Sequence, residues 1–267
     1  MHSQGLVVQY LFTAQGDAAL VAILSGRPLI ALDFDGTLAD IVDRPGDARI
    51  APELSAQLAE LALHLPVAIV TGRSIDDVKA RLGFTPLHIV GNHGAEDGVD
   101  HPAAAHRVRQ LDPLRSRLDP LAGLLSDAGV RVEDKGQSMA LHYRLAPDPV
   151  RARAVIDAAL HGLGEDLRTF AGKMVVNVVP VQAPDKAVAV RKLVQRCATS
   201  AALFAGDDVN DEPVFVSAPA HWLTIRVGFD CADSHAHYFI DEPGDMRLLF
   251  ARMLMLLKGG PPVERLP

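Results

Sequence analysis

An apolar run that ends in a pair of acids constrains this chain most. Residues 28–32 read Pro-Leu-Ile-Ala-Leu and lead directly into Asp33-Phe34-Asp35-Gly36-Thr37. A short continuous apolar run is typical of a buried parallel strand, and a glycine lets the chain turn at its carboxyl end. Open α/β sheets bind ligands at that end, so Asp33 and Asp35 are expected to share one crevice. Two close carboxylates repel each other unless a divalent cation or a proton lies between them, and both conditions suit phosphoryl transfer.

Three later segments extend this pattern. Residues 67–70 form a second apolar run that ends at Thr71, and residues 202–205 form a third that leads into Gly206-Asp207-Asp208 and, three residues later, Asp211. Lys186 begins a helical pattern between them. A doubly wound sheet would bring all of these to the same crevice. Taken one at a time, Lys186 is more typical of a solvated helix start, Thr71 of a strand end and D-x-D-G of an acidic turn, so the argument rests on their combination.

In this order the four segments resemble the signature of the haloacid dehalogenase superfamily of phosphatases. The resemblance implies that Asp33 is the nucleophile and Asp35 the general acid and base, with Thr71 and Lys186 holding the phosphoryl oxygens. It further implies a Mg²⁺ held by Asp33, the backbone carbonyl of Asp35 and Asp207. Asp208 and Asp211 would orient the waters of the metal or Lys186.

The fold class expected is α/β, a Rossmann-like core with a parallel sheet plus an inserted α+β cap. We expect the core to comprise residues 1–100 and 183–267, and the cap residues 101–182. Core helices are expected at 52–65, after a Ser74 cap, at 186–196, from 211 to 217 and at 246–257, and further strands at 87–90 and 222–227. In the cap, helices are expected at 107–129 and 150–163, and strands at 131–133, 139–143 and 174–179.

Composition and charge disfavour several classes of binding partner. The 267 residues carry a formal net charge of −7, which disfavours a general nucleic-acid binder. Cys197 and Cys231 form no metal-ligand cluster, and we expect them to be buried apolar side chains in a reducing compartment. The apolar stretch 6–12 fits neither a signal peptide nor a membrane span, so a cytoplasmic protein with no membrane partner, and a monomer, is expected. The eleven histidines include no H-E-x-x-H pattern, which disfavours zinc.

Four segments in and around the predicted cap carry a narrower resemblance. These are Gly91-Asn92-His93-Gly94-Ala95-Glu96, residues 132–138, Leu141-His142-Tyr143-Arg144 and residues 172–180. They are similar to the trehalose-6-phosphate phosphatase family, and the resemblance covers residues 28–240. It implies a small-molecule sugar phosphate as substrate, bound by these residues: Arg73, Asn92, His93, Glu133, Lys135, Lys173 and Asn177.

Two positions depart from that family. Asn177 stands where the family usually has Glu, and Lys186-Ala187 where it has Lys-Gly. Asn177 is neutral and shorter, so the second sugar ring could be held differently. Another sugar-phosphate phosphatase with the same cap therefore stays open, acting on a sucrose, mannosylglycerate-type or glucosylglycerol-type phosphate. Two alternatives of another class are a phosphate-accepting signalling receiver, which is about half this size, and a silent binding protein, which would be expected to lack Asp33 or Asp35.

Overall fold

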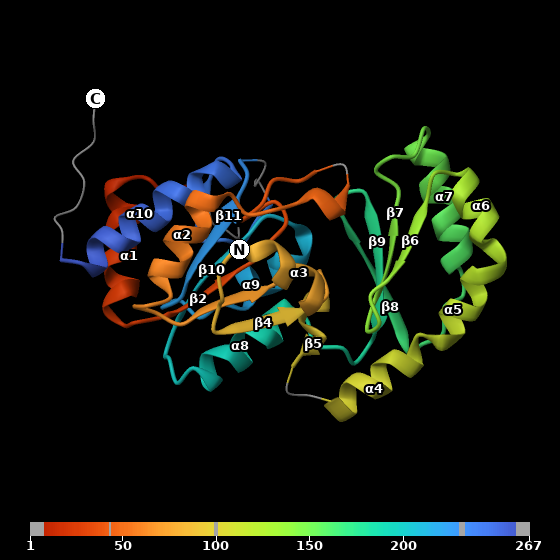
Figure 1. The fold of residues 1–267 in the computed structure, drawn as a ribbon, viewed down its shortest axis with the longest axis horizontal. Coiled ribbons are helices and arrows are strands. Elements are labelled where there is room, and N and C mark those ends of the chain that lie inside the picture. The colour runs from red at the N-terminus through yellow and green to blue at the C-terminus, as the bar shows by residue number, and fades with distance from the viewer. Residues whose placement is uncertain (1–7, 43, 99–100, 230–232, 260–267) are drawn as a thin grey trace, which may run out of the picture.

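The structure is a computed structural model that describes residues 8–42, 44–98, 101–229 and 233–259. It contains two separate sheets, one of eight strands and one of four (Figure 1). None of the helices formed by these residues is long and apolar enough to cross a membrane.

The eight-stranded sheet is parallel except at one edge. Its order is β1-β12-β11-β10-β2-β3-β4-β5, and only β5 runs antiparallel to its neighbour. The central strands are the three apolar runs, β2 (Leu29–Leu32), β3 (Val67–Val70) and β10 (Ala202–Gly206), and every residue in them is buried. The others are β1 (Gln9–Tyr10), β4 (His88–Gly91), β5 (Glu96–Asp97), β11 (Leu223–Val227) and β12 (Tyr238–Ile240).

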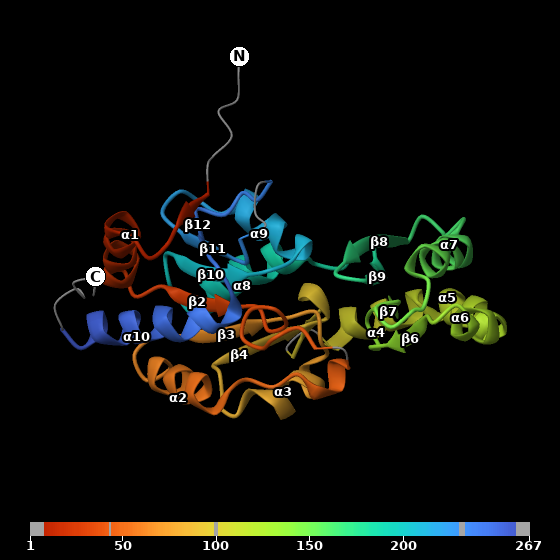
Figure 2. The ribbon, with the colours of Figure 1, turned by 90° about the horizontal axis from the view of Figure 1, so that it is seen from above.

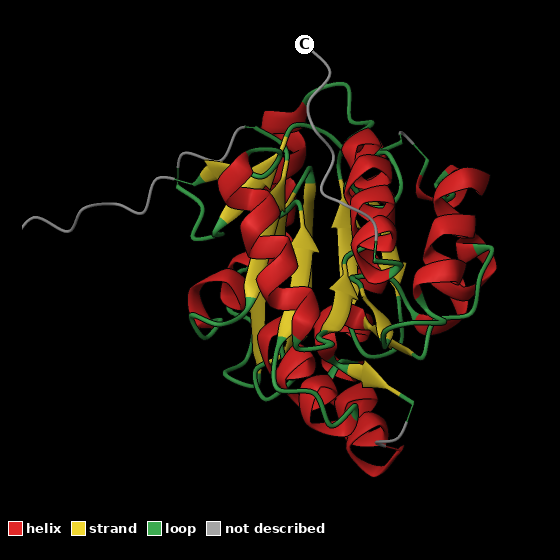
Figure 3. Ribbon diagram, turned by 90° about the vertical axis from the view of Figure 1, so that its left-hand side faces the viewer, coloured by secondary structure: helices red, strands yellow, loops and turns green. Residues whose placement is uncertain are grey.

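Helices cover this sheet (Figure 3). Helix α2 (Pro52–Leu61) packs against α10 (Met246–Leu257), and α8 (Lys186–Arg196) packs against α9 (Glu212–Ser217). Helix α3 (Ile75–Leu82) begins after Ser74, whose side chain accepts a hydrogen bond from the amide of Asp77 and so caps the helix. Helix α1 (Ala14–Ser25) contacts α10.

The four-stranded sheet is antiparallel, with the order β6-β7-β9-β8. Its strands are β6 (Arg131–Asp134), β7 (Met139–His142), β8 (Leu167–Gly172) and β9 (Val175–Pro180). Helices α5 (Asp112–Leu118), α6 (Ala122–Asp127) and α7 (Pro149–Leu160) lie on the side away from the large sheet (Figures 1 and 2). Together these elements have their own apolar cluster, and we call them the small-sheet unit.

The α/β fold class with a mostly parallel sheet is confirmed. The helix expected over 107–129 is wrong as a continuous element, because the chain forms α4 (His101–Gln110), α5, a 3₁₀ turn and α6. Pro113 and Pro120 stand in the first turns of α5 and the 3₁₀ turn, where they cannot donate the bonds that would continue a preceding helix.

Several elements were not expected, namely β1, β5, β8, β12 and α1. Strand β8 alternates exposed and half-buried residues, so it lacks an apolar run, and α1 is an alanine-rich segment before the first acid motif. Cys197 is half-buried rather than buried, with a free thiol, and Cys231 lies outside the described residues. The unit boundaries at residues 101 and 182 stay a prediction.

Candidate active site

The carboxyl ends of β2, β3 and β10 form the floor of the site. β2 lies between the other two strands, with Leu32 opposite Ile69 on one side and Ala205 on the other. The residues that follow, Asp33 and Asp207, therefore emerge side by side at the same sheet edge, as the apolar runs predict.

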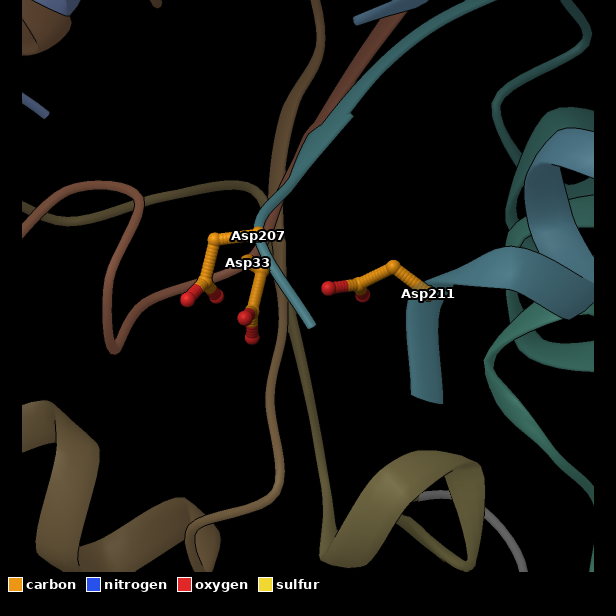
Figure 4. A group of neighbouring side chains, drawn as sticks. All are labelled: Asp33, Asp207 and Asp211. Carbon is orange, nitrogen blue, oxygen red and sulfur yellow. The ribbon is translucent and has the colours of Figure 1, made fainter. Parts of the chain in front are cut away.

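Three buried carboxylates meet at this edge (Figure 4). Oxygens of Asp33, Asp207 and Asp211 lie within 4.8 Å of one another. The close approach requires a glycine in the first motif, because a Cβ at Gly36 would lie 2.0 Å from an oxygen of Asp207. Gly36 also has a φ of +75°, which glycine adopts without strain.

Lys186 neutralises part of this cluster. Its ammonium lies 2.8 Å from Asp33 Oδ1 and 2.7 Å from Asp211 Oδ1, and its side chain is 1% exposed. Lys186 opens α8, where the helix dipole opposes a cation, so the two carboxylates must hold it there. The second oxygen of Asp211 accepts the amide of Asp208 at 3.0 Å. Both oxygens of Asp211 are thus engaged within the protein.

Asp33 and Asp207 are left short of positive charge. Burial raises the pKa of Asp33 well above its usual value, even though Lys186 opposes the shift, and burial with the nearby Asp211 raises the pKa of Asp207 to about 6. Asp207 Oδ1 is buried without a hydrogen-bond partner. An unpartnered buried carboxylate oxygen beside a second acid is what a small, hard divalent cation binds. The donor set therefore fits Mg²⁺.

Asp35 points elsewhere. Arg73 Nε and Nη2 donate to its two oxygens at 2.7 and 2.6 Å, and the side chain of Asp35 is 42% exposed. Arg73, which sequence reasoning placed near the sugar, lines the cleft, and its buried guanidinium holds this carboxylate. Thr71 is fully buried and its hydroxyl accepts the amide of Arg73 at 3.2 Å.

A cleft of about 1230 Å³, its open mouth included, lies above this floor, between it and the small-sheet unit. Glu133 lines it from β6, Lys135 from the turn between β6 and β7, and Lys173 from the turn between β8 and β9. Lys135 donates to the carbonyl of Gly72 at 2.9 Å, and Lys173 lies 2.6 Å from Asp207 Oδ2. Both predicted sugar-binding lysines thus already reach the floor of the cleft.

Glu133 is held within the small-sheet unit. Its carboxylate lies 2.7 Å from Nε2 of His142, and this hydrogen bond, with help from Lys135 and Arg131, lowers the pKa of Glu133 to about 2. Glu133 therefore faces the cleft as a carboxylate.

His93, Asn92 and Asn177 occupy different positions. His93 lines the cleft with a neutral ring, because burial lowers its pKa well below the usual value. Asn177 also lines the cleft, from β9. Asn92 is buried beneath it and joins the two sheets: its amide donates to Glu96 at 2.8 Å and its oxygen accepts the hydroxyl of Ser138.

Asp208 was expected to orient the waters of the metal or Lys186, which stays a prediction. Its oxygens accept the amide of Val209 and the side chain of Asn210, both at 2.8 Å, so it caps the following turn.

Two further residues, Asp77 and His142, line the cleft without a role predicted from the sequence. The spacing of Asp77 four residues from both Arg73 and Arg81 was the signal available for it.

The chain is similar in sequence to proteins of one family. The sequence profile of the trehalose-phosphatase family matches residues 31–243. A probable trehalose-phosphate phosphatase of Sinorhizobium fredii is 35% identical over 235 residues, which are 84% of this chain and 87% of that protein. A trehalose-phosphate phosphatase of Mycobacterium marinum is 36% identical over 214 residues, 75% of this chain, and the chain spans about half, 54%, of that relative's length.

Solved structures agree. A crystal structure of a trehalose-6-phosphate phosphatase related protein has a TM-score of 0.69 and 26% identity, with 85% of this chain and 97% of that one covered. The sucrose-phosphatase of Synechocystis has a TM-score of 0.55 at 17% identity, covering 85% and 98%, and shows the fold alone.

The fold and its row of acids at the sheet edge are those of a haloacid dehalogenase-type phosphatase, a hydrolase of phosphoric monoesters. More narrowly, the chain belongs to the trehalose-phosphatase family.

Proposed function

We propose that this chain hydrolyses trehalose 6-phosphate to trehalose and phosphate, with Mg²⁺ and through an aspartyl-phosphate on Asp33. One observation carries the proposal: Asp33 lies buried between Lys186 and Asp207, at the floor of a cleft whose other wall supplies Glu133, Lys135 and Lys173. The floor offers a nucleophile for phosphorus, and the wall offers charged groups for sugar hydroxyls.

In the first step a carboxylate oxygen of Asp33 attacks phosphorus, and the bond to the sugar oxygen breaks. Asp35 gives that oxygen a proton. In the second step Asp35 takes a proton from water, the water oxygen attacks the phosphorus of the aspartyl-phosphate, and phosphate leaves with Asp33 restored. Lys186 and the hydroxyl of Thr71 would hold the phosphoryl oxygens, on which negative charge is spread in the transition state.

Asp33 and Asp207 would hold Mg²⁺, with the backbone carbonyl of Asp35. The ion would offset the repulsion between the carboxylate of Asp33 and the incoming phosphate. Asp211, with both oxygens engaged, would position Lys186, and Asp208 would hold the turn that carries Asp211.

We propose that residues 101–182 form the cap that selects the sugar. Ionised Glu133 would accept hydroxyl protons, and Lys135 and Lys173 would donate to hydroxyl oxygens. A wrong sugar leaves these groups unpaired, and that discriminates against it. His93 and Asn177, which also face the cleft, would contact the same sugar, and Arg73 and Asn92 would act from beneath by holding Asp35 and Ser138.

Asn177 keeps a second candidate in view, another sugar phosphate bound by the same cap. Phosphate release should be measured with Mg²⁺ across trehalose 6-phosphate, sucrose 6-phosphate, glucosylglycerol phosphate, mannosylglycerate phosphate and glucose 6-phosphate. The highest kcat/KM on trehalose 6-phosphate supports the proposal. A clear preference for another member of the panel would move the substrate while leaving the chemistry in place.

A further inference from the structure

A chain of four alternating charges runs from the floor of the cleft to the surface. Asp35 accepts from Arg73, Arg73 Nη1 donates to Asp77 at 2.7 Å, and Arg81 donates to both oxygens of the same Asp77. Arg81 also donates to the carbonyl of Gly46 at 2.6 Å. Asp77 is therefore a carboxylate shared by two guanidinium groups.

Arg73 is fixed on several sides. Its side chain is 9% exposed, its guanidinium carbon lies 5.2 Å from the ring centre of Phe34, and it is pinned between two carboxylates. Asp35, by contrast, is 42% exposed and projects into the cleft. The direction of its carboxylate is thus set by the guanidinium that grips both of its oxygens.

The two carboxylates on Arg73 differ in how they are held. Asp35 projects into the cleft, where the proposed reaction takes place. Asp77 accepts hydrogen bonds through both of its oxygens from a second guanidinium, that of Arg81, which also donates to the carbonyl of Gly46. Asp77 is therefore fixed independently of Asp35 and can anchor Arg73.

We propose that Asp77 is a positioning residue for acid–base catalysis: it anchors Arg73, which in turn aims Asp35 at the leaving oxygen. The inference rests on the proposed function, because it needs Asp35 as the acid and base. It predicts that losing the anchor harms the reaction most where the leaving group needs a proton.

Asp77→Asn tests this, with Asp76→Asn as its matched control. Asp76 stands in the same first turn of α3 but is 98% exposed and 3.9 Å from Lys79, so it reports the loss of a charge at the helix start alone. The substrates are ethyl phosphate, whose alkoxide leaving group needs a proton, and 4-nitrophenyl phosphate, whose leaving group does not. Ethyl phosphate carries no sugar hydroxyl, so a lower rate on this substrate cannot reflect a missing sugar contact.

General acid–base catalysis contributes roughly 10²–10⁴-fold, and a displaced acid keeps part of that. We therefore expect Asp77→Asn to lower kcat/KM, which includes only the steps up to departure of the alcohol or phenol, by about 10- to 100-fold on ethyl phosphate and by less than about 3-fold on 4-nitrophenyl phosphate. Asp76→Asn should leave both rates unchanged. Equal losses on the two substrates, or no loss beyond the control, would overturn the inference.

Two further variants separate its failure from that of the proposed function. Arg73→Lys keeps the charge but cannot donate two parallel hydrogen bonds to Asp35. It should therefore also lower the rate on ethyl phosphate more than the rate on 4-nitrophenyl phosphate, even if Asp77→Asn fails to fold. Asp35→Asn should show that pattern most strongly. If Asp35→Asn loses no more on ethyl than on 4-nitrophenyl phosphate, the acid–base role falls and the inference with it. If Asp35→Asn behaves as expected while Asp77→Asn and Arg73→Lys do not, only the inference falls.

Discussion

Asp33 is the residue on which the chemistry depends. It is buried, it touches Lys186, and it belongs to the acid cluster at the end of β2. Asp33→Asn has nearly the same shape but can neither attack phosphorus nor neutralise a cation, so turnover should fall essentially to background while the fold is kept. Phosphate release and circular dichroism on the same sample check this. Near-normal turnover in a folded variant would end the mechanism proposed here.

Lys186 has a second role in stability. It is the buried cation between Asp33 and Asp211. Lys186→Met removes it and leaves two buried carboxylates without their partner, which should lower the free energy of unfolding by about 3–5 kcal/mol. Urea unfolding in excess chelator measures the loss.

A double variant separates the two roles of Lys186. Adding Asp211→Asn to Lys186→Met removes one of the stranded charges, so stability should return in part while activity stays absent. Recovery of activity in the double variant would show that Lys186 acts only through the fold.

Glu133 gives a pH signature. Its hydrogen bond with His142 lowers its pKa from the usual 4.5 to about 2. A carboxylate whose pKa is lower in the folded chain stabilises the fold above the unfolded value, and that contribution is lost as the pH falls through the folded value. Glu133→Gln should therefore be less stable than the parent at pH 7, and the gap should shrink between pH 4.5 and pH 2. Urea midpoints across that range test this, and a gap that widened in acid would contradict it.

At the scale of elements, the β6–β7 hairpin connects the two sheets. Its tip carries Lys135, which donates to Gly72, and Ser138, which donates to Asn92. Arg107, at the end of α4, binds both Gln137 in the same tip and the carbonyl of Ala95, at 2.9 and 2.7 Å. The hairpin therefore belongs to the small-sheet unit but contacts the floor of the cleft through its tip.

Shortening single side chains of this hairpin should separate substrate recognition from the chemical step. Each charged hydrogen bond contributes roughly 1.5–3 kcal/mol, so Glu133→Ala or Lys135→Ala should lower kcat/KM on trehalose 6-phosphate by about 10- to 150-fold. Hydrolysis of 4-nitrophenyl phosphate, which is too small to use these contacts, should change much less. Both substrates are assayed on each variant. Equal losses would place these residues in the chemistry or the fold.

The elements that can be predicted from the sequence are those marked by a clear hydrophobic pattern. Apolar runs at 29–32, 67–70 and 202–205 identify the central strands, and their order along the chain places the acids at one sheet edge. Strand β8 could not be predicted because it is held by pairing with β9 and has no apolar run of its own. Side-chain direction escaped as well. The spacing of Asp77 four residues after Arg73 was a signal for their pairing. Nothing in the sequence says that Arg73 also turns toward Asp35, since that depends on how the turn before α3 lies against the chain that follows β2.

At the scale of the whole molecule, the two units enclose a floor that is short of positive charge. Asp33 and Asp207 have raised pKa values, and one oxygen of Asp207 is buried without a partner. The other oxygen of Asp207 forms an ion pair with Lys173 of the small-sheet unit. A divalent ion at this floor would therefore bind only the folded chain, and it would lie where the two units meet.

Metal removal should then change stability as well as activity. A ligand that binds only the folded chain stabilises it by RT ln(1 + [L]/Kd), about 2.7 kcal/mol at one hundred times Kd, which for a chain of this size raises Tm by on the order of 5–10 °C. Mg²⁺ should produce that rise and restore the activity lost in chelator, and Zn²⁺ should do so poorly because the floor offers only oxygen ligands. Asp207→Asn should abolish the rise, whereas Asp208→Asn, whose carboxylate serves the following turn, should keep most of it. Full activity after exhaustive dialysis against chelator, with no Mg²⁺-dependent shift in Tm, would show that the acids at this sheet edge serve the fold and not a metal.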